Sequence, residues 1–359
     1  MRIQVDCRKI QENAEAIVAL CASRGIDVVG VTKACCGEPE VARAMLDGGA
    51  QMLADSQLSH IRHLREGGIE SDLMLLRLPR ISEVDEVVTL TQVSLNSEVD
   101  TVRALSRAAE ARGVEHRVIL MVETGDRREG IMPERAAEAA GVILDLPHVE
   151  LVGLGTNLAC IGGVLPTRKN ARLFVDVVED VEEILGTRFP VLSGGHTSNL
   201  DLLTRKEMPE RINQLRVGEG ILLGVNSTTN NAIPAPHQDA FTVFAEVVEL
   251  QTKPSLPEGE IAVDAFGRKP EWEDLGPRRR AILALGEQYV RVAGLRPQRS
   301  GTWIVGASSD HTVLDVTEAD PPVVLGDELA FGANYSAVAT AMASTTLVKD
   351  VRAIASYRR

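Results

Sequence analysis

An alternation of short β-rich runs with amphipathic stretches over about the first 225 residues most constrains the fold of this chain. The helical stretches between these runs include residues 40–46, 99–112 and 134–144, where apolar side chains recur at helical spacing. Eight such units match a (β/α)8 TIM barrel, which typically takes ~250 residues, and a doubly wound parallel sheet is the alternative. The eight predicted strands are residues 28–33, 51–56, 73–78, 92–97, 116–124, 149–157, 189–195 and 214–221.

The pattern of apolar and polar residues changes after Gly224. Residues 226–236 are polar and contain proline, which is typical of a domain boundary. Residues 241–249, 302–305 and 312–316 then alternate or are β-branched, with Gly and Pro between them. We therefore predict an α/β chain of two domains, a (β/α)8 barrel over residues 1–235 and a C-terminal, mainly β domain over residues 236–359.

Charge and composition exclude several classes of partner. With 38 Lys and Arg against 51 Asp and Glu, the net charge of -13 argues against nucleic acid and anionic membranes. The N-terminus lacks an apolar signal core, and no 18-residue apolar stretch follows. The 5 cysteines form no CxxC pair, so we expect no disulfide framework and no metal site. A cytoplasmic protein fits these features best.

Lys33 ends the first predicted strand, directly before a helical segment. An ammonium group at the end of a buried strand is costly to desolvate, so its pKa tends to fall toward the range where a neutral amine attacks a carbonyl. Such a lysine suits Schiff-base chemistry. A solvated loop lysine is the alternative from position alone.

Other polar side chains follow further strands, at the barrel end where catalytic groups sit. Arg128 follows the fifth strand, Asn157 closes the sixth, and Arg216 lies in the eighth, shortly before Gly218. A guanidinium inside a barrel needs an acceptor, and an internal ion pair to Glu219 is one alternative for Arg216.

The seventh strand leads into the glycine-rich turn Ser193-Gly194-Gly195-His196-Thr197-Ser198-Asn199. Its backbone N–H groups and hydroxyls could cradle a phosphate at a helix start. Ordinary helix N-capping by Thr197 or Ser198 is the alternative.

Taken together, the motifs of the chain resemble the alanine racemase superfamily of pyridoxal phosphate enzymes, and more closely its ornithine, or basic amino acid, racemase branch. The resemblance covers nearly the whole chain. The motifs are VGVTKACCGEPEVARAMLDGG (29–49), MLADS (52–56), LMLLRLPRISEV (73–84), SLNSE (94–98), VETGDRREGI (122–131), GLGTNLACIGG (153–163), LSGGHTSNL (192–200), LRVGEGILLG (215–224) and GASSDHTVLDVT (306–317).

The resemblance implies a pyridoxal 5'-phosphate enzyme acting on an amino acid, and a homodimer with shared active sites. It also implies a role for each strand-end residue. By this resemblance, Lys33 would carry the cofactor and Arg128 would contact the side of the ring that bears the hydroxyl. Asn157 would stand where alanine racemases keep a ring-stacking histidine, and Arg216 would face the pyridine nitrogen. The phosphate would be bound by Ser193, Gly195, Thr197 or Ser198, and Gly218.

The arginine at the ring nitrogen carries mechanistic information. A guanidinium there disfavours protonation of the nitrogen, which weakens the ring as an electron sink and makes transamination less favourable. Decarboxylases of the same architecture are expected to place a carboxylate at this nitrogen, and the chain has no counterpart of their EPGR segment. Racemisation through two acid/base groups on opposite faces of Cα is therefore the predicted reaction.

The second acid/base group is less defined than Lys33. Related alanine racemases use a tyrosine from the partner's β domain, in an I-G-Y segment that aligns with residues 285–289 here. This chain has Glu287 at the aligned position and Tyr289 two residues later. Tyr289, Glu287, Asp310 and His311 are the candidates, and a structural role is an alternative for each.

The substrate is predicted from less specific features. A cationic side chain would want a carboxylate in the pocket, and residues 264–267 and 271–274 contain several. Ornithine or another basic amino acid is the leading expectation, with an alanine or broad-specificity racemase as the alternative. A noncatalytic pyridoxal phosphate carrier would consist of the barrel alone, so the long segment after Gly224 favours an enzyme.

Overall fold

The computed structural model describes residues 1–359 except residues 227, 230, 265 and 355–359. The chain divides into two compact units. The barrel unit comprises Arg8–Gln238, and the β unit comprises Met1–Cys7 with Asp239–Arg359.

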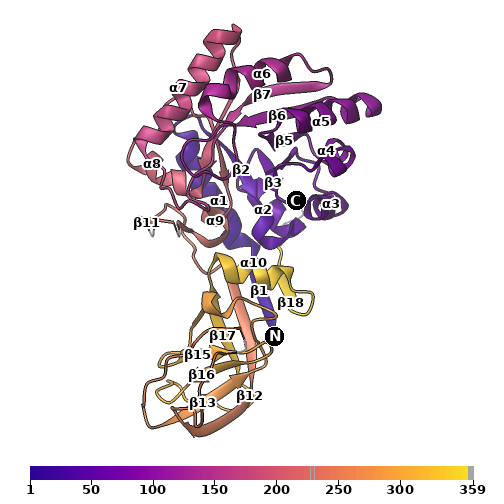
Figure 1. Ribbon diagram of the computed structural model, residues 1–359. Helices are drawn as coiled ribbons and strands as arrows, with labels where there is room; N and C mark the ends of the chain where they lie inside the picture. The colour runs from indigo at the N-terminus through magenta and orange to yellow at the C-terminus, as the bar shows by residue number, and fades with distance from the viewer. Residues whose placement is uncertain (227, 230, 265, 355–359) are drawn as a thin grey trace. The chain divides into compact units, whose positions relative to one another are not determined.

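Eight parallel strands of the barrel unit form a closed barrel, as the alternating pattern predicts (Figure 1). The first of them, β2, pairs with both β3 and β9, which closes the ring. Inward-facing apolar side chains such as Val31, Met74 and Ile119 fill the barrel interior. The strands are β2 (Asp27–Val31), β3 (Met52–Asp55), β4 (Leu73–Leu75), β5 (Val93–Asn96), β6 (His116–Met121), β7 (Val149–Gly155), β8 (Val191–His196) and β9 (Gln214–Val217).

Helices surround this barrel, and the side chains of Glu38 and Thr167 cap the first turns of α2 and α7. In α7, the Thr167 hydroxyl accepts the Asn170 N–H, while the Asn170 side chain accepts the Thr167 N–H. None of the described helices is long and apolar enough to cross a bilayer. The helices are α1 (Cys7–Ala22), α2 (Pro39–Asp47), α3 (Leu58–Glu66), α4 (Val84–Leu90), α5 (Val99–Arg112), α6 (Ala136–Leu144), α7 (Arg168–Leu185), α8 (Leu200–Thr204) and α9 (Glu219–Leu223), with 3-10 turns η1 (Lys33–Cys35), η2 (Ile81–Glu83), η3 (Pro133–Arg135) and η4 (Thr197–Asn199).

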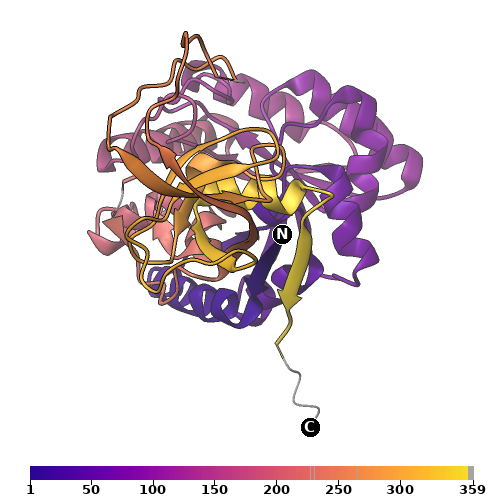
Figure 2. The same ribbon diagram turned by 90° about the horizontal axis from the view of Figure 1, so that it is seen from below.

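The β unit is built on an antiparallel sheet in the order β14-β17-β12-β13-β16-β15. The N-terminal strand β1 (Arg2–Asp6) joins this sheet beside β12 and also pairs in parallel with β18. Figures 1 and 2 therefore show the indigo N-terminal strand beside a yellow strand from the other end of the chain. The remaining elements are β12 (Phe241–Pro254), β13 (Pro277–Leu283), η5 (Val292–Gly294), β14 (Leu295–Pro297), β15 (Trp303–Ala307), β16 (Thr312–Asp315), β17 (Glu328–Ala333), α10 (Tyr335–Ala343) and β18 (Val348–Arg352).

The observed units do not coincide with the predicted domains, since the barrel unit comprises Arg8–Gln238 and the predicted barrel comprises residues 1–235. Residues 1–7 belong to the β unit, because β1 pairs with β12 and β18. The polar segment after Gly224 belongs to the barrel unit, since β10 (Val225–Asn226) pairs with β11 (Asn231–Ala232). Buried Asp201 accepts hydrogen bonds from both the Asn226 and the Asn231 side chains, at 3.1 and 2.6 Å. Residues 227 and 230 of the predicted linker lie outside the described residues.

Helix α10 was not expected in a region where helical periodicity fades. Its sequence is rich in alanine, a strong helix former, and its first turn is capped by the Asn334 side chain, which accepts the Ala337 N–H at 3.1 Å. An alanine-rich segment carries little amphipathic signal. A pattern search based on periodicity therefore misses it.

Candidate active site

Lys33 lies just past the end of β2 and opens the 3-10 turn η1, so the strand is shorter than the sequence predicts. Its side chain is accessible to solvent, yet protein surrounds its amino group. This enclosure lowers the pKa of the Lys33 ammonium, and the positive charges of Arg128 and Arg216 lower it further, while Cys160 and Asp55 act in the opposite direction. A lowered pKa makes the neutral, nucleophilic amine available nearer to neutral pH.

A buried carboxylate fixes the backbone immediately before Lys33. Asp55 ends β3 and is fully buried, and its Oδ2 accepts the Thr32 hydroxyl at 2.7 Å. Its Oδ1 accepts the Ser56 N–H at 2.6 Å and lies 2.9 Å from His60 Nδ1. The hydrogen bond to Asp55 raises the pKa of His60 to about 10, so His60 is protonated at neutral pH. This pair therefore supports the turn that presents Lys33.

Arg216 is buried inside the barrel on β9, with 4% of its surface exposed. Its Nη1 donates to the Ser193 hydroxyl and to the Ser193 carbonyl oxygen at 3.3 Å, and its Nη2 donates to the Thr156 carbonyl oxygen at 2.8 Å. None of these acceptors is a carboxylate, so the predicted alternative of an ion pair with Glu219 does not describe the guanidinium's hydrogen bonds. Burial lowers the pKa of Arg216 to about 10, and the group stays protonated at neutral pH.

The glycine-rich turn is organised by its own side chains. The Asn199 amide fills the space above Gly195, where a Cβ atom would lie 2.2 Å from Asn199 Oδ1. Gly195 also has a φ of +129°, a conformation that side-chain-bearing residues rarely adopt. The Thr197 hydroxyl accepts the Gly220 N–H at 3.1 Å, which ties the turn to the start of α9. Its own proton remains available for a ligand acceptor.

The other residues expected to bind phosphate differ in how they are engaged. The buried Ser193 hydroxyl donates to Gln214 Oε1 at 2.7 Å and accepts from Arg216, so it serves the arginine. The Ser198 hydroxyl lies 3.5 Å from His196 Nδ1. Gly218 precedes α9 and packs closely on β2, since a Cβ atom there would lie 3.1 Å from Val31 Cβ.

Arg128 and Asn157 complete the set of predicted cofactor contacts. Arg128 is exposed and forms an ion pair with its neighbour Glu129. Asn157 lies past the end of β7, and its amide donates to the Cys160 sulfur at 3.2 Å. Cys160 is exposed and lies within electrostatic range of Lys33, Arg128 and Arg216.

Sequence reasoning assigned no role to Cys160, His196 or the Asp55–His60 pair. His196 Nε2 lies 2.7 Å from the Leu158 carbonyl oxygen, and burial together with the charges of Arg216, Lys33 and Arg128 lowers its pKa to about 4. His196 is thus neutral at physiological pH. Each of these residues except His60 lies inside one of the motifs given above. No single motif, however, indicates which of these residues lie close together in the fold.

In the β unit, the structure brings together two of the proposed acid/base candidates. The Tyr289 hydroxyl donates to Asp310 Oδ1 at 2.9 Å; the tyrosine is half-buried and the aspartate is exposed. This hydrogen bond raises the pKa of the Tyr289 phenol. Hydrogen bonds from Ser309 and Tyr289 lower the pKa of the Asp310 carboxyl.

Glu287 and His311 have different surroundings. Glu287 Oε2 accepts the Val292 N–H at 3.3 Å, and its Oε1 lies 3.9 Å from Arg268 Nη1. The His311 carbonyl oxygen accepts the Ser308 N–H at 2.8 Å, which closes the turn that carries Asp310.

The carboxylates proposed for a cationic substrate are also in the β unit. Asp264 closes its own loop by accepting the Phe266 and Arg268 N–H groups and pairing with the Arg268 guanidinium. Asp274 accepts the Gly276 N–H at 2.9 Å. Glu271 and Glu273 are exposed, and Ala265 lies outside the described residues.

Comparisons with known proteins place the chain in a family. The family model for the N-terminal domain of alanine racemase matches residues 5–225. The chain belongs to the alanine racemase family. The ornithine racemase of Acetoanaerobium sticklandii is 36% identical, over 98% of this chain and 99% of that protein. The lysine racemase of Thermotoga maritima is 38% identical, over 97% of each chain.

Solved structures support the fold. The alanine racemase from Streptomyces lavendulae gives a TM-score of 0.75 with 19% identity, over 98% of this chain and 96% of that one. The D-threonine aldolase from Filomicrobium marinum gives a TM-score of 0.75 with 14% identity, over 95% and 88%. At these identities the two likenesses show a shared architecture, a barrel followed by a β domain.

Proposed function

We propose that the chain is a pyridoxal 5'-phosphate-dependent racemase of a basic amino acid such as ornithine or lysine, acting in the cytoplasm as a homodimer. The observation that carries the proposal is the pairing of Lys33, with its lowered pKa, with a buried Arg216 whose hydrogen bonds to the described residues go to the neutral oxygens of Ser193 and Thr156. The two full-length relatives, an ornithine racemase and a lysine racemase, support the substrate class.

The chemistry of the donor set fits the cofactor. A buried guanidinium without a carboxylate partner suits a neutral ring nitrogen, and a lysine of lowered pKa suits an aldehyde. Thr197 and Ser198, with the backbone around Gly195 and Gly218, would hold the phosphate, while Arg128 and Asn157 would flank the ring. Bound there, the cofactor would acidify the substrate Cα–H by drawing electrons toward its ring.

The chain's own residues would then move the protons. Lys33 Nζ would take a proton from one face of Cα as a neutral amine, and would return one to that face as an ammonium group. Arg216 keeps its proton throughout, because a pKa of about 10 leaves it charged at neutral pH. It would therefore offer no acid to a ring nitrogen beside it, and this would favour reprotonation of Cα over transamination.

The opposite face needs a second group, and Tyr289 is our leading candidate, ahead of Glu287, Asp310 and His311. Its phenol is partly exposed and is oriented by its hydrogen bond to Asp310. We propose that the β unit of the partner subunit carries this tyrosine to the barrel mouth. Cys160 beside Asn157 is the alternative within the barrel, because its thiol is a titratable group near Lys33.

The purified protein tests the proposal directly. Its visible spectrum should show bound cofactor, and circular dichroism should show loss of optical activity with L-ornithine or L-lysine. Racemisation of alanine alone would overturn the substrate class, whereas absence of both cofactor absorbance and racemisation would overturn the function.

The shared site has its own test. Mixing inactive Lys33→Ala protein with inactive Tyr289→Phe protein should regenerate activity, because one site of each mixed dimer is intact. Subunit exchange verified by mass spectrometry without recovery of activity would place both acid/base groups on one chain.

A further inference from the structure

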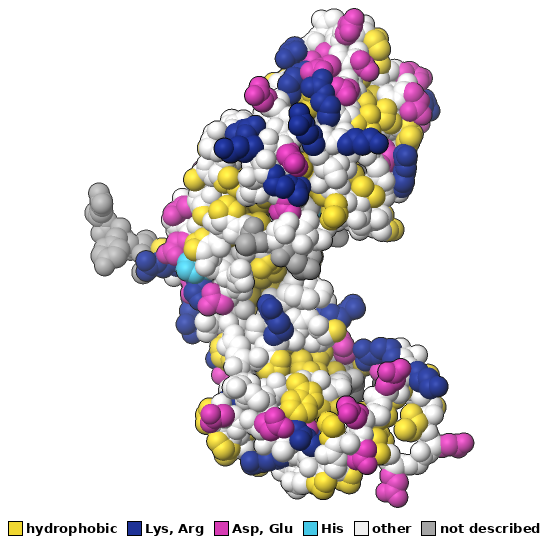
Figure 3. Space-filling model, turned by 90° about the vertical axis from the view of Figure 1, so that its left-hand side faces the viewer, with side chains coloured by type: hydrophobic (Ala, Val, Ile, Leu, Met, Phe, Trp, Pro, Cys, Tyr) yellow, Lys and Arg dark blue, Asp and Glu magenta, His cyan; other side chains and the backbone are white. Residues whose placement is uncertain are grey.

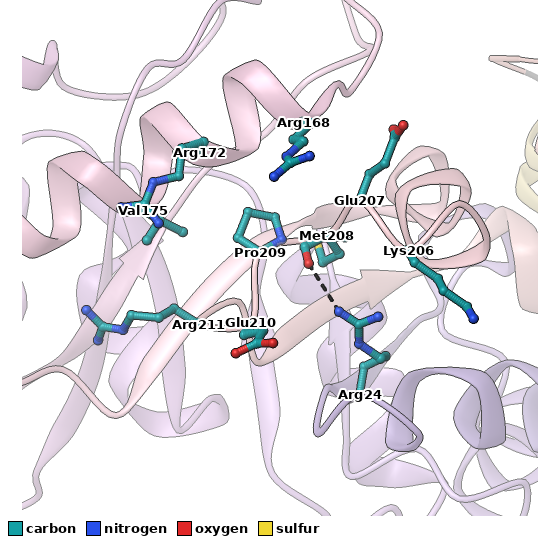
Figure 4. Close-up of a pocket in the computed structure, with 10 residues that line it drawn as sticks. All are labelled: Arg24, Arg168, Arg172, Val175, Lys206, Glu207, Met208, Pro209, Glu210 and Arg211. Carbon is teal, nitrogen blue, oxygen red and sulfur yellow. Dashed lines mark hydrogen bonds between the residues drawn. The ribbon is translucent and has the colours of Figure 1, made fainter.

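A positively charged recess lies on the outside of the barrel unit, apart from the residues proposed for catalysis. It is formed by the start of α7, the turn after α1 and the segment between α8 and β9, and its volume is about 410 Å³ (Figure 4). That volume lies in the range of small-molecule sites. The lining residues are Arg24, Arg168, Arg172, Val175, Lys206, Glu207, Met208, Pro209, Glu210 and Arg211.

The recess is cationic although the chain carries a net charge of -13. Figure 3 shows Lys and Arg side chains, with Asp and Glu side chains among them, on one face of the barrel unit. Two of the lining arginines have carboxylate partners: Arg172 pairs with Asp176 at 2.6 Å and Arg211 with Glu182 at 2.7 Å. These two charges are therefore largely compensated.

The other lining cations are not compensated in this way. Among the described residues, no carboxylate pairs with Arg24, Arg168 or Lys206. Arg24 donates to the Met208 carbonyl oxygen at 3.4 Å, a long and weak contact. Of the two lining carboxylates, Glu207 pairs with Arg205 at 3.3 Å, which leaves Glu210 as a single negative charge against three positive ones.

The two arginines without carboxylate partners, Arg24 and Arg168, both line the recess. Figure 4 shows the Arg168 and Arg24 guanidinium groups on either side of Met208 and Pro209, whereas Lys206 points away from Arg168. Two guanidinium groups facing one cavity repel each other unless an anion lies between them. Guanidinium groups match the oxygens of phosphate in geometry as well as charge.

The start of α7 adds a second electrostatic mismatch at the same place. This helix of 18 residues has no acidic residue in its first turn and begins with Arg168 and Lys169. The N-terminal end of a helix carries a partial positive charge, so cations there are unfavourable and an anion is favourable. Arg168 therefore destabilises the anion-free protein in two ways, through repulsion of Arg24 and through its place at the positive end of α7. A bound anion would offset both effects.

We propose that this recess binds a small phosphomonoester, with its phosphate group held between Arg24 and Arg168. The volume exceeds what inorganic phosphate needs, so the phosphate would carry an organic group that lies against the half-buried Pro209. The site is separate from the barrel mouth, since Lys33, Arg128 and Arg216 do not line it.

The test uses cofactor-loaded protein, so that the mouth of the barrel is already filled, with adenosine monophosphate and inorganic phosphate as probes in calorimetric titrations. Arg168→Ala and Arg24→Ala should each weaken binding of both probes about tenfold or more, because each removes a charge-assisted hydrogen bond. The matched control is Arg107→Ala, an exposed arginine on α5 away from the recess. It should bind both probes as the unaltered protein does.

Arg168→Glu gives a second signature, which a merely structural arginine would not produce. An acidic residue at the start of α7 should raise the thermal stability of the phosphate-free protein, and it should abolish the further rise that phosphate causes. Equal probe affinity in all the variants, or binding by inorganic phosphate alone, would overturn the proposal. The latter outcome would indicate a site for free phosphate.

Discussion

The titratable groups of the barrel unit and those of the β unit differ in how completely their surroundings fix them. In the barrel, Arg216 is buried with three hydrogen bonds, and Asp55 is fully buried beneath the turn that carries Lys33. In the β unit, half-buried Tyr289 donates a hydrogen bond to exposed Asp310. On our proposal the barrel supplies the groups for cofactor chemistry, whereas the β-unit pair would act on a partner subunit.

The largest expected effect is that of Lys33→Ala. This change removes the amine that would hold the cofactor and one of the two proton-transfer groups, so visible absorbance and racemisation should both disappear. Spectrophotometry and polarimetry measure the two effects. Lys169→Ala, at the start of α7, is a matched control and should keep both the absorbance and the activity. An unchanged spectrum in Lys33→Ala would contradict the role of Lys33 in holding the cofactor.

Arg216→Glu should change the kind of reaction as well as its rate. A carboxylate would allow protonation of the ring nitrogen, which should produce new long-wavelength absorbance and side transamination. Arg216→Lys preserves the positive charge and should not give either effect. Keto acid formation measures transamination, and normal racemisation by Arg216→Glu without new absorbance would reduce the arginine to a structural role.

Asp310→Asn tests whether the Tyr289–Asp310 pair of the β unit takes part in the reaction. The hydrogen bond to Asp310 raises the Tyr289 pKa, so removing the carboxylate should let that pKa fall back toward its ordinary value. If the deprotonated phenol is the working base, the rising limb of the pH–rate profile should shift to lower pH. A profile unchanged by Asp310→Asn would separate this pair from the reaction.

A smaller effect is expected on stability. The folded-state pKa of His60 is about 10, above its unfolded value near 6.5, so its contribution is fully present below pH 6.5 and is lost as pH rises through 10. His60→Gln should therefore cost about 1.5–3 kcal/mol at pH 7, the usual worth of a charged hydrogen bond, and less at pH 10. Urea unfolding at both pH values measures this, and an equal cost at both would mean that packing dominates.

The sequence predicts local features better than spatial ones. The apolar runs that define the eight barrel strands are readable because buried parallel strands are nearly continuous in Val, Ile and Leu. The pairing of Asp55 with His60, and of Tyr289 with Asp310, depends on which turns the fold brings together. The N-terminal strand of the β unit could not be assigned either, because its partners lie more than two hundred residues away along the chain.

Stereospecific exchange of the substrate Cα hydrogen in deuterium oxide tests the central claim, that the barrel supplies one acid/base group and the β unit the other. Tyr289→Phe should slow racemisation by about 10²- to 10⁴-fold, yet Lys33 should still exchange the Cα hydrogen of one enantiomer. Cys160→Ser should leave exchange of both enantiomers intact. One-sided exchange in Cys160→Ser, with symmetrical exchange in Tyr289→Phe, would place both groups in the barrel and contradict the account.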